Sequence, residues 1–207
     1  MTLPRSDSGS TTLRVIGWVL TIVVMVAILI PVVALTFSVQ VTGKSMEPTL
    51  HEQDRLLANM LAKGDVQRFD LVEARLEGGG LAVKRVIGLP GDKLAVSTVK
   101  GDTPTVRLIP AGTTQEHRVE NPVWTGQVGE RTKACCDKNG TATGKVGWVT
   151  VPAGQYWVLG DNWGGSDDSR KYGFVPATDI GATLNMRLLP LGSFGTVAHE
   201  ARLVPVD

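Results

Sequence analysis

The run Leu81-Ala82-Val83-Lys84-Arg85-Val86-Ile87-Gly88-Leu89-Pro90-Gly91-Asp92 starts as a largely apolar segment and ends in a turn that contains Gly and Pro. A short apolar run bounded by turn residues is typical of a strand buried in a β-sheet. Lys84 and Arg85 interrupt the run, and an extended backbone sends neighbouring side chains to opposite faces. We therefore expect one cation to point into a core or cleft and the other outward. An edge strand with two solvated cations is the alternative.

Further short apolar runs surround this stretch, and turns rich in Gly and Pro separate them. We expect strands at Leu71–Leu76, Trp148–Val151 and Tyr156–Leu159. Short strands between such turns predict a mainly β protein whose folded domain is an all-β sandwich or barrel. The region of about 93–147 is more polar and richer in turns, so we interpret it as a smaller inserted subdomain.

The segment Val15–Leu35 has 21 consecutive residues without a charge. A membrane-spanning helix needs about 20 such residues, whereas the apolar part of a cleaved signal peptide has about 7–15. We predict a cytoplasmic tail at 1–13, a transmembrane signal-anchor at 14–36 and an extracytoplasmic domain at 37–207. Arg14 directly precedes the apolar run, which favours a cytoplasmic N-terminus. A buried core helix is the alternative reading.

The composition argues against several classes of protein. A formal net charge of +1 leaves no basic surplus, and aromatic residues make up only 5% of the chain, so nucleic acid is not an expected partner. The histidines are scattered, at His51, His117 and His199, and we expect no metal and no cofactor. Cys135 and Cys136 are adjacent, and a bond between neighbours needs a strained ring, so we expect no disulfide-stapled scaffold and interpret the pair as packed or surface thiols whose role stays open.

The segment Gly43-Lys44-Ser45-Met46-Glu47-Pro48-Thr49-Leu50 begins eight residues after Leu35, close to the predicted membrane surface. A serine hydroxyl becomes a nucleophile when a base removes its proton. A lysine serves as that base if burial leaves its amine neutral. With the histidines scattered, Lys84 is the available base for Ser45, as in Ser-Lys variants of the serine protease triad. The other reading is a turn in which Pro48 ends a strand.

The polar loop Gly160-Asp161-Asn162-Trp163-Gly164-Gly165-Ser166-Asp167-Asp168-Ser169-Arg170 directly follows the apolar run that ends at Leu159. Asp, Asn, Ser and Arg side chains in so short a stretch favour a hydrogen-bonded network that supports a site. A calcium loop is a second reading, although the Gly and Trp positions miss the EF-hand pattern. A plain solvated turn fits the composition equally well.

Together these motifs resemble the type I signal peptidases, also called leader peptidases, which are membrane-anchored Ser-Lys proteases. The order is an anchor, G-x-S-M-x-P-T-L, Arg68-Phe69-Asp70, K-R-V-I-G-L-P-G-D, and G-D-N followed by S-x-D-S-R. The resemblance covers roughly Leu13 to Gly192, except for the region of about 93–147. The short anchor and compact domain are similar to the Gram-positive or actinobacterial branch of the family.

The resemblance implies a serine endopeptidase that cleaves signal peptides from exported preproteins at the membrane. Ser45 would attack the scissile carbonyl, and Lys84 would act as general base and then as general acid. Ser166 would hydrogen-bond the lysine amine and orient it. The supporting ion pairs would be Asp161 with Arg85 and Asp168 with Arg170. Pockets for small side chains at the −1 and −3 positions would be walled by Met46, Val41, Leu50, Ala82 and Val83.

Two positions depart from the family pattern. Some members carry a serine two positions before the nucleophile as a second oxyanion donor, and Gly43 stands there in this chain. Trp163-Gly164-Gly165 replaces charged or Asn residues that many members have in the loop. The expected partners are exported preproteins and membrane lipid. Other hypotheses are a processing peptidase with one narrow substrate, a non-catalytic anchored binding module, and a self-cleaving regulator like the SOS-type repressors. Such regulators need a DNA-binding domain, and this chain has the predicted membrane helix where that domain would be.

Overall fold

The computed structural model describes residues 8–78, 80–98, 103–128, 133–197 and 200–206 of the 207-residue chain. The chain divides into two compact units, Met1–Ser38 and Val39–Asp207. His199 and parts of the predicted insertion lie outside the described residues.

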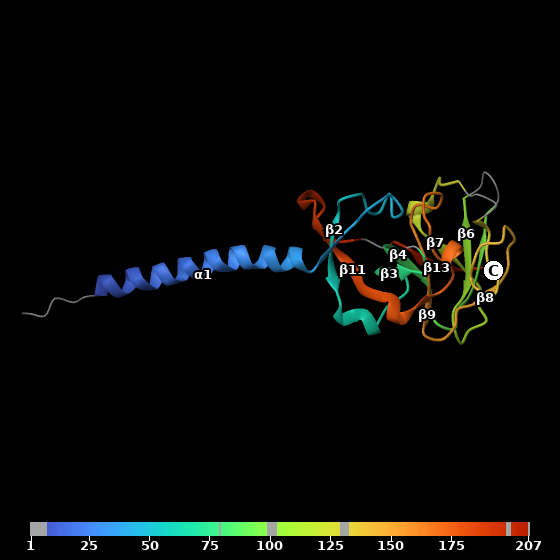
Figure 1. The fold of residues 1–207 in the computed structure, drawn as a ribbon, viewed down its shortest axis with the longest axis horizontal. Coiled ribbons are helices and arrows are strands. Elements are labelled where there is room, and N and C mark those ends of the chain that lie inside the picture. The colour runs from blue at the N-terminus through green and yellow to red at the C-terminus, as the bar shows by residue number, and fades with distance from the viewer. Residues whose placement is uncertain (1–7, 79, 99–102, 129–132, 198–199, 207) are drawn as a thin grey trace, which may run out of the picture. The chain divides into compact units, whose positions relative to one another are not determined.

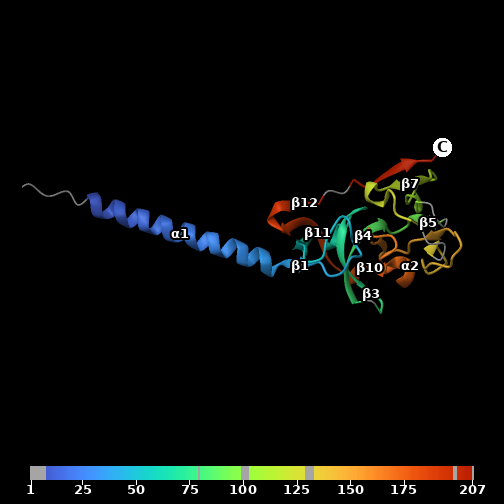
Figure 2. The same ribbon diagram turned by 90° about the horizontal axis from the view of Figure 1, so that it is seen from above.

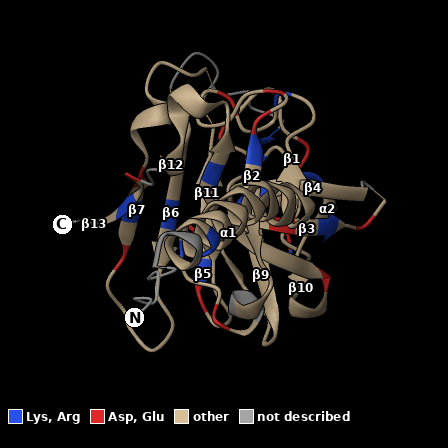
Figure 3. Cartoon of the chain, turned by 90° about the vertical axis from the view of Figure 1, so that its left-hand side faces the viewer, with Lys and Arg blue, Asp and Glu red and all other residues tan. Residues whose placement is uncertain are grey.

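The first unit contains helix α1, which runs from Ser8 to Thr36. Its segment Thr11–Thr36 has a mean hydropathy of 2.9 and buries none of its side chains, so it is long and apolar enough to cross a membrane. Arg14 is the one charged residue of α1, and Figure 3 colours most of the helix as uncharged. The helix confirms the predicted apolar segment, while its orientation stays a prediction.

The second unit is built on two β-sheets (Figure 1, Figure 2). The larger sheet has eight strands in the order β1-β2-β11-β3-β4-β9-β10, with β12 paired to β11. Its strands are β1 (Ser38–Gln40), β2 (Arg55–Asn59), β3 (Leu71–Leu76), β4 (Gly80–Gly88), β9 (Gln155–Leu159), β10 (Val175–Pro176), β11 (Ile180–Leu189) and β12 (Gly195–Thr196). The predicted mainly β fold is therefore confirmed.

The smaller sheet has five strands in the order β13-β7-β6-β5-β8. They are β5 (Lys93–Ser97), β6 (Thr105–Ile109), β7 (His117–Glu120), β8 (Val149–Thr150) and β13 (Arg202–Pro205). The region of about 93–147 thus supplies three of the five strands, and the C-terminal strand completes the sheet against β7. Short helical elements link the strands: η1 (Leu61–Gly64), η2 (Pro122–Trp124), α2 (Ser169–Tyr172), η4 (Ala177–Asp179) and η5 (Leu191–Ser193).

Strand β4 belongs to the larger sheet and contains most of the stretch quoted first. The next strand of the chain, β5, belongs to the smaller sheet. It pairs antiparallel with β3 along its N-terminal part and with β9 from Arg85 onward. At Gly88 a Cβ atom would lie 2.7 Å from the Leu94 side chain and 2.9 Å from that of Val151, so only glycine fits at the end of β4. The chain leaves the larger sheet there and enters the smaller sheet at Lys93, the first residue of β5.

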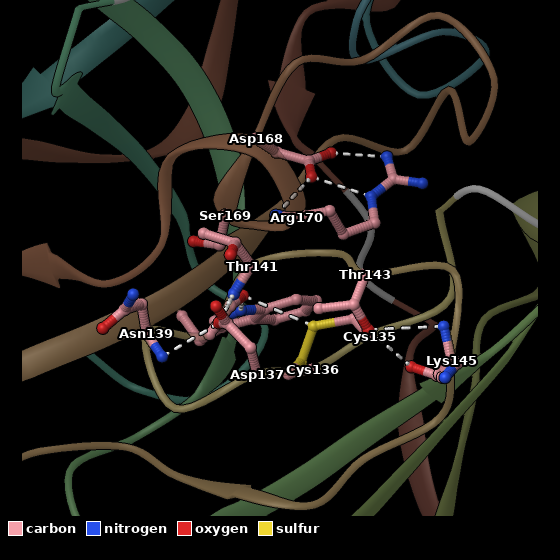
Figure 4. Close-up of a disulfide and its surroundings, with 12 residues drawn as sticks. Cys135, Cys136, Asp137, Asn139, Thr141, Thr143, Lys145, Asp168, Ser169 and Arg170 are labelled. Atoms are coloured by element: carbon pink, nitrogen blue, oxygen red, sulfur yellow. Dashed lines mark hydrogen bonds and ion pairs between the residues drawn. A yellow bond between two sulfur atoms is a disulfide. The ribbon is translucent and has the colours of Figure 1, made fainter.

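Cys135 and Cys136 form a disulfide between adjacent residues, which corrects the expectation of two thiols (Figure 4). That expectation rested on the ring that two neighbouring cysteines must close; in the structure the peptide between them is cis and the two Cα atoms are 3.0 Å apart. Both residues are buried in the cluster around Trp157. Cys135 also exchanges two backbone hydrogen bonds with Val96 at 2.9 and 3.0 Å, so the disulfide adjoins β5.

Candidate active site

Ser45 lies on a turn whose apolar side chains pack into the core. Val41 before the serine and Met46 and Leu50 after it are buried in one cluster with Leu56, which fixes the turn on either side of the serine. The Leu50 N–H donates to the Met46 carbonyl at 2.9 Å and closes the turn. Gly43 has φ +79°, a conformation that glycine adopts without strain, so a side chain at this position is disfavoured by the backbone itself.

Lys84 projects from β4 directly at Ser45. Its Nζ atom donates a hydrogen bond to Ser45 Oγ at 2.7 Å, and only 2% of the residue is exposed. Burial lowers the pKa of the Lys84 amine below its usual value of 10.5, against the opposing effect of the Asp168 and Asp167 carboxylates. The site thus brings a desolvated amine to a serine hydroxyl that lies 39 residues away in sequence.

Arg85 lies on the opposite face of β4 and is also buried, with 1% exposed. The prediction that one of the two cations points outward is therefore wrong, because both faces of β4 are covered: Lys84 meets Ser45, and Arg85 meets Asp161 and the Phe69 carbonyl. The Asp161 carboxylate neutralises Arg85 through two hydrogen bonds, at 2.9 Å to Nε and 2.6 Å to Nη2. The expected ion pair is formed.

The Asp161 carboxylate also accepts hydrogen bonds from two other segments of the chain. Its Oδ2 atom accepts a hydrogen bond from Thr49 Oγ1 at 2.5 Å, from the end of the Ser45 turn. Its Oδ1 atom accepts from Asn121 Nδ2 at 3.4 Å, from the connection between β7 and η2. One buried carboxylate therefore binds β4, the Ser45 turn and the smaller sheet.

The second expected ion pair, between Asp168 and Arg170, is formed as well (Figure 4). Asp168 accepts from Arg170 Nε at 2.8 Å and from Nη2 at 2.6 Å, and it also accepts the Gly160 N–H at 3.1 Å. The Arg170 guanidinium stacks over the Trp163 ring at 4.6 Å, and Trp163 is fully buried. The unusual tryptophan of this loop thus covers the arginine of the ion pair.

Ser166 is buried beside the site without the hydrogen bond expected for it. Its Oγ atom has no hydrogen-bond partner within the described part of the chain, so the expected bond to Lys84 is not formed in this structure. The Lys84 amine is directed at Ser45 instead. Ser166 packs against Gly160, where an added Cβ would collide with both Ser166 Oγ and the Ser45 carbonyl oxygen.

A cavity of about 180 Å³ opens beside Ser45. Four of the five predicted wall residues line it, namely Val41, Met46, Ala82 and Val83. The fifth, Leu50, is fully buried in the cluster behind them and does not line this cavity, which corrects that assignment. The lining also includes Gln40, which is exposed, and Glu73, which is half-buried.

A second cavity, of about 310 Å³, shares Thr42, Ser45 and Ala82 with the first. It also includes Lys84 and Asp167 in its lining. The serine therefore lies where the two cavities meet. No group of three or more His, Cys, Asp or Glu side chains among the described residues is arranged to hold a metal ion.

Comparison with known proteins decides the family. The family model described as "Signal peptidase, peptidase S26" matches residues 14–189. The chain belongs to this family. It is 33% identical over 168 residues to signal peptidase I of Bacillus caldolyticus, covering 74% of this chain and 80% of the relative. It is 28% identical over 186 residues to signal peptidase IB of Staphylococcus aureus strain COL, covering 87% and 93%.

A solved signal peptidase I from Enterococcus faecalis V583 is 28% identical to this signal peptidase family member, with a TM-score of 0.40. The similarity covers 58% of this chain and 97% of that chain. The resemblance inferred from the motifs is confirmed at the level of the family, since the matched residues 14–189 include all of those motifs.

Two residues of this S26 family member that hold the Ser45 turn were not assigned from sequence. The Asn162 N–H donates to the Ser45 carbonyl at 3.0 Å, and Asn162 Nδ2 donates to the Lys44 carbonyl at 3.0 Å. Gln127 binds the backbone on both sides of Asn162. Asn162 is part of the G-D-N motif, so the sequence contained a signal that it belongs to the site. Gln127 lies in the region without a recognised motif, where no such signal exists.

Proposed function

We propose that this chain is a membrane-anchored serine endopeptidase that uses Ser45 and Lys84 to cleave signal peptides from exported preproteins. The observation that carries the proposal is the 2.7 Å contact between the buried Lys84 amine and the Ser45 hydroxyl. Membership of the signal peptidase family supports the substrate class. Helix α1 supports a membrane anchor, and we assign the unit that begins at Val39 to the extracytoplasmic side.

The geometry supports acyl transfer through a covalent intermediate. Neutral Lys84 accepts the Ser45 proton while Ser45 Oγ bonds to the scissile carbonyl carbon. The lysine then gives this proton to the leaving amine as the peptide C–N bond breaks. Lys84 next takes a proton from water, which attacks the acyl-enzyme, and the returning proton restores the Ser45 hydroxyl. The released products are the signal peptide carboxylate and the new N-terminus of the exported protein.

The backbone of the Ser45 turn offers a donor for the tetrahedral oxyanion. Within the described residues, the Ser45 N–H donates to no carbonyl or side chain. A preorganised N–H at the nucleophile stabilises the charge that develops on the carbonyl oxygen during attack. The Ser45 carbonyl is meanwhile bound by Asn162, which fixes the orientation of the turn.

An extended peptide suits the surface beside the serine. Strand β9 pairs with β4 from Arg85 onward, and no described strand pairs with residues 80–84 on that side. A substrate can add as a strand along this free stretch. Side chains at −1 and −3 of an extended peptide point the same way. The cavity of about 180 Å³ then accepts small side chains and excludes large ones.

The test is cleavage of a preprotein by the purified full chain in detergent, with the new N-terminus sequenced. Ser45→Ala and Lys84→Ala should each abolish cleavage and leave the circular dichroism spectrum unchanged. Lys93→Ala, on an exposed position of β5, is the matched control and should cleave normally. Persistent cleavage by either site variant would refute the dyad. Cleavage of one preprotein out of several unrelated ones would favour a narrow processing peptidase.

A further inference from the structure

The structure assigns a positioning role to Gln127, a residue of the smaller, inserted region. We propose that its side chain holds the loop at 161–163 in the geometry that keeps the Ser45 turn ready for attack. The inference rests on the proposed function of Ser45. On this inference, a residue of the inserted region helps to hold the active site in place.

The Gln127 carboxamide pairs with the loop at two points. Its Nε2 donates to the Asp161 carbonyl at 2.9 Å, and its Oε1 accepts the Trp163 N–H at 2.6 Å. These two backbone groups flank Asn162, so the side chain bridges the backbone as a neighbouring strand would. Nε2 also donates to the Val123 carbonyl at 2.8 Å, which ties the carboxamide to η2.

Asn162 transmits this constraint to the nucleophile. Its N–H and its Nδ2 donate to the carbonyls of Ser45 and Lys44, both at 3.0 Å. Gln127 thus acts on Ser45 through one intervening residue. Attack on a carbonyl requires the reacting atoms to be held in line, and a displacement of about 1 Å can reduce the rate about 100-fold.

The remaining contacts of the loop explain why the chain should stay folded when the Gln127 carboxamide is removed. Asp161 keeps its two hydrogen bonds to Arg85, and Trp163 stays buried beneath Arg170. Gln127 does not line either cavity at Ser45. Its loss should therefore loosen Asn162 and the serine turn without changing the surface that binds the peptide.

The chain offers a matched control in Gln115. Its Nε2 also donates to two backbone carbonyls, those of Glu116 and Val206, both at 3.1 Å, next to the ends of β7 and β13. Gln127→Met and Gln115→Met each remove one carboxamide and keep the side-chain length. A third variant, Gln127→Glu, keeps the acceptor for the Trp163 N–H and loses the donor to the Asp161 carbonyl.

The variants are compared as full chains in detergent with a signal-peptide substrate. Gln127→Met should lower kcat about tenfold with KM within about twofold, and Gln127→Glu should also lower kcat. Gln115→Met should leave kcat unchanged, and all melting temperatures should stay close to that of the wild type. Unchanged kcat for Gln127→Met, or an equal loss for Gln115→Met, would overturn the inference.

Amide hydrogen exchange separates this inference from the proposed function, because it needs no catalysis. Gln127→Met should speed exchange of the Asn162 and Trp163 amides, while Gln115→Met should not. Unchanged exchange at these amides overturns the positioning role even in an active enzyme. A wild-type chain that cleaves no preprotein refutes the proposed function, whichever way the exchange experiment turns out.

Discussion

The Nζ atom of Lys84 lies 2.7 Å from the Oγ atom of Ser45, and only 2% of Lys84 is exposed. Burial disfavours the charged form of an amine, so a larger fraction of Lys84 is neutral and able to accept a proton at a given pH. The same burial separates this lysine from the solvated lysines of the chain. The hydrogen bond and the desolvation together turn a common side chain into a candidate base.

The pH dependence of cleavage should report Lys84. Its pKa is lowered from 10.5, and the neutral amine is the form that accepts a proton from Ser45. We expect kcat/KM to rise with pH through an apparent pKa below 10.5, as Lys84 loses its proton. The measurement is kcat/KM across pH for a substrate that does not titrate. A rise centred at 10.5 or above would contradict the prediction.

Replacing Lys84 by Met should stabilise the protein at neutral pH while it abolishes cleavage. Because the folded-state pKa is lowered, the unfolded chain binds the proton more tightly. Stability therefore rises with pH between the folded-state pKa and 10.5, and below this window the protonated lysine opposes folding. We expect a gain of about 1 kcal/mol, or about 2–4 °C in melting temperature. Thermal melts at pH 7 would show no gain if the site solvates the amine.

Removing the Asp161 carboxylate should severely destabilise the fold. Asp161→Ala leaves the Arg85 guanidinium buried and unpaired, which typically costs about 3–5 kcal/mol. The control is Glu120→Ala, which breaks the exposed pair with Arg202 and should change stability little. Urea unfolding of both variants decides the point. Equal midpoints would mean that water or another group compensates Arg85.

Adding one methyl group at Gly160 should impair the active site. Its Cβ would collide with the Ser45 carbonyl oxygen and with Ser166 Oγ, so the serine turn must shift. We expect Gly160→Ala to lose at least about 90% of kcat/KM, since small displacements at a nucleophile reduce rates strongly. Gly164→Ala is the control within the same loop, because no atom lies within 4 Å of its Cβ. Similar activity of the two variants would argue against the close packing.

Residue types with distinctive chemistry were the ones that sequence could predict. A serine followed 39 residues later by a lysine in an apolar strand gave the central pair, and the family resemblance implied both buried ion pairs. Strand β4 was predicted because its apolar run is bounded by turn residues. The error at Arg85 arose because the strand pattern does not show which neighbours will cover it.

The features that sequence did not predict depend on the backbone or on packing depth. Gln127 binds two backbone groups, and since every residue has such groups, no residue type signals the contact. Leu50 differs from Met46 only in how far it lies behind the cavity wall. The disulfide between Cys135 and Cys136 joins neighbouring residues, a pairing that the sequence reasoning set aside.

The convergence of three side chains on the Asp161 carboxylate has a consequence for the order in which the site is assembled. Thr49, Arg85 and Asn121 meet a carboxylate that is translated after all of them. A nascent chain that ends near residue 150 already contains Ser45 and Lys84, but it lacks Asp161 and Asn162, which organise them. On the proposed function, competence to cut peptide bonds therefore arrives only with the last quarter of synthesis, when Asp161 and Asn162 have been added.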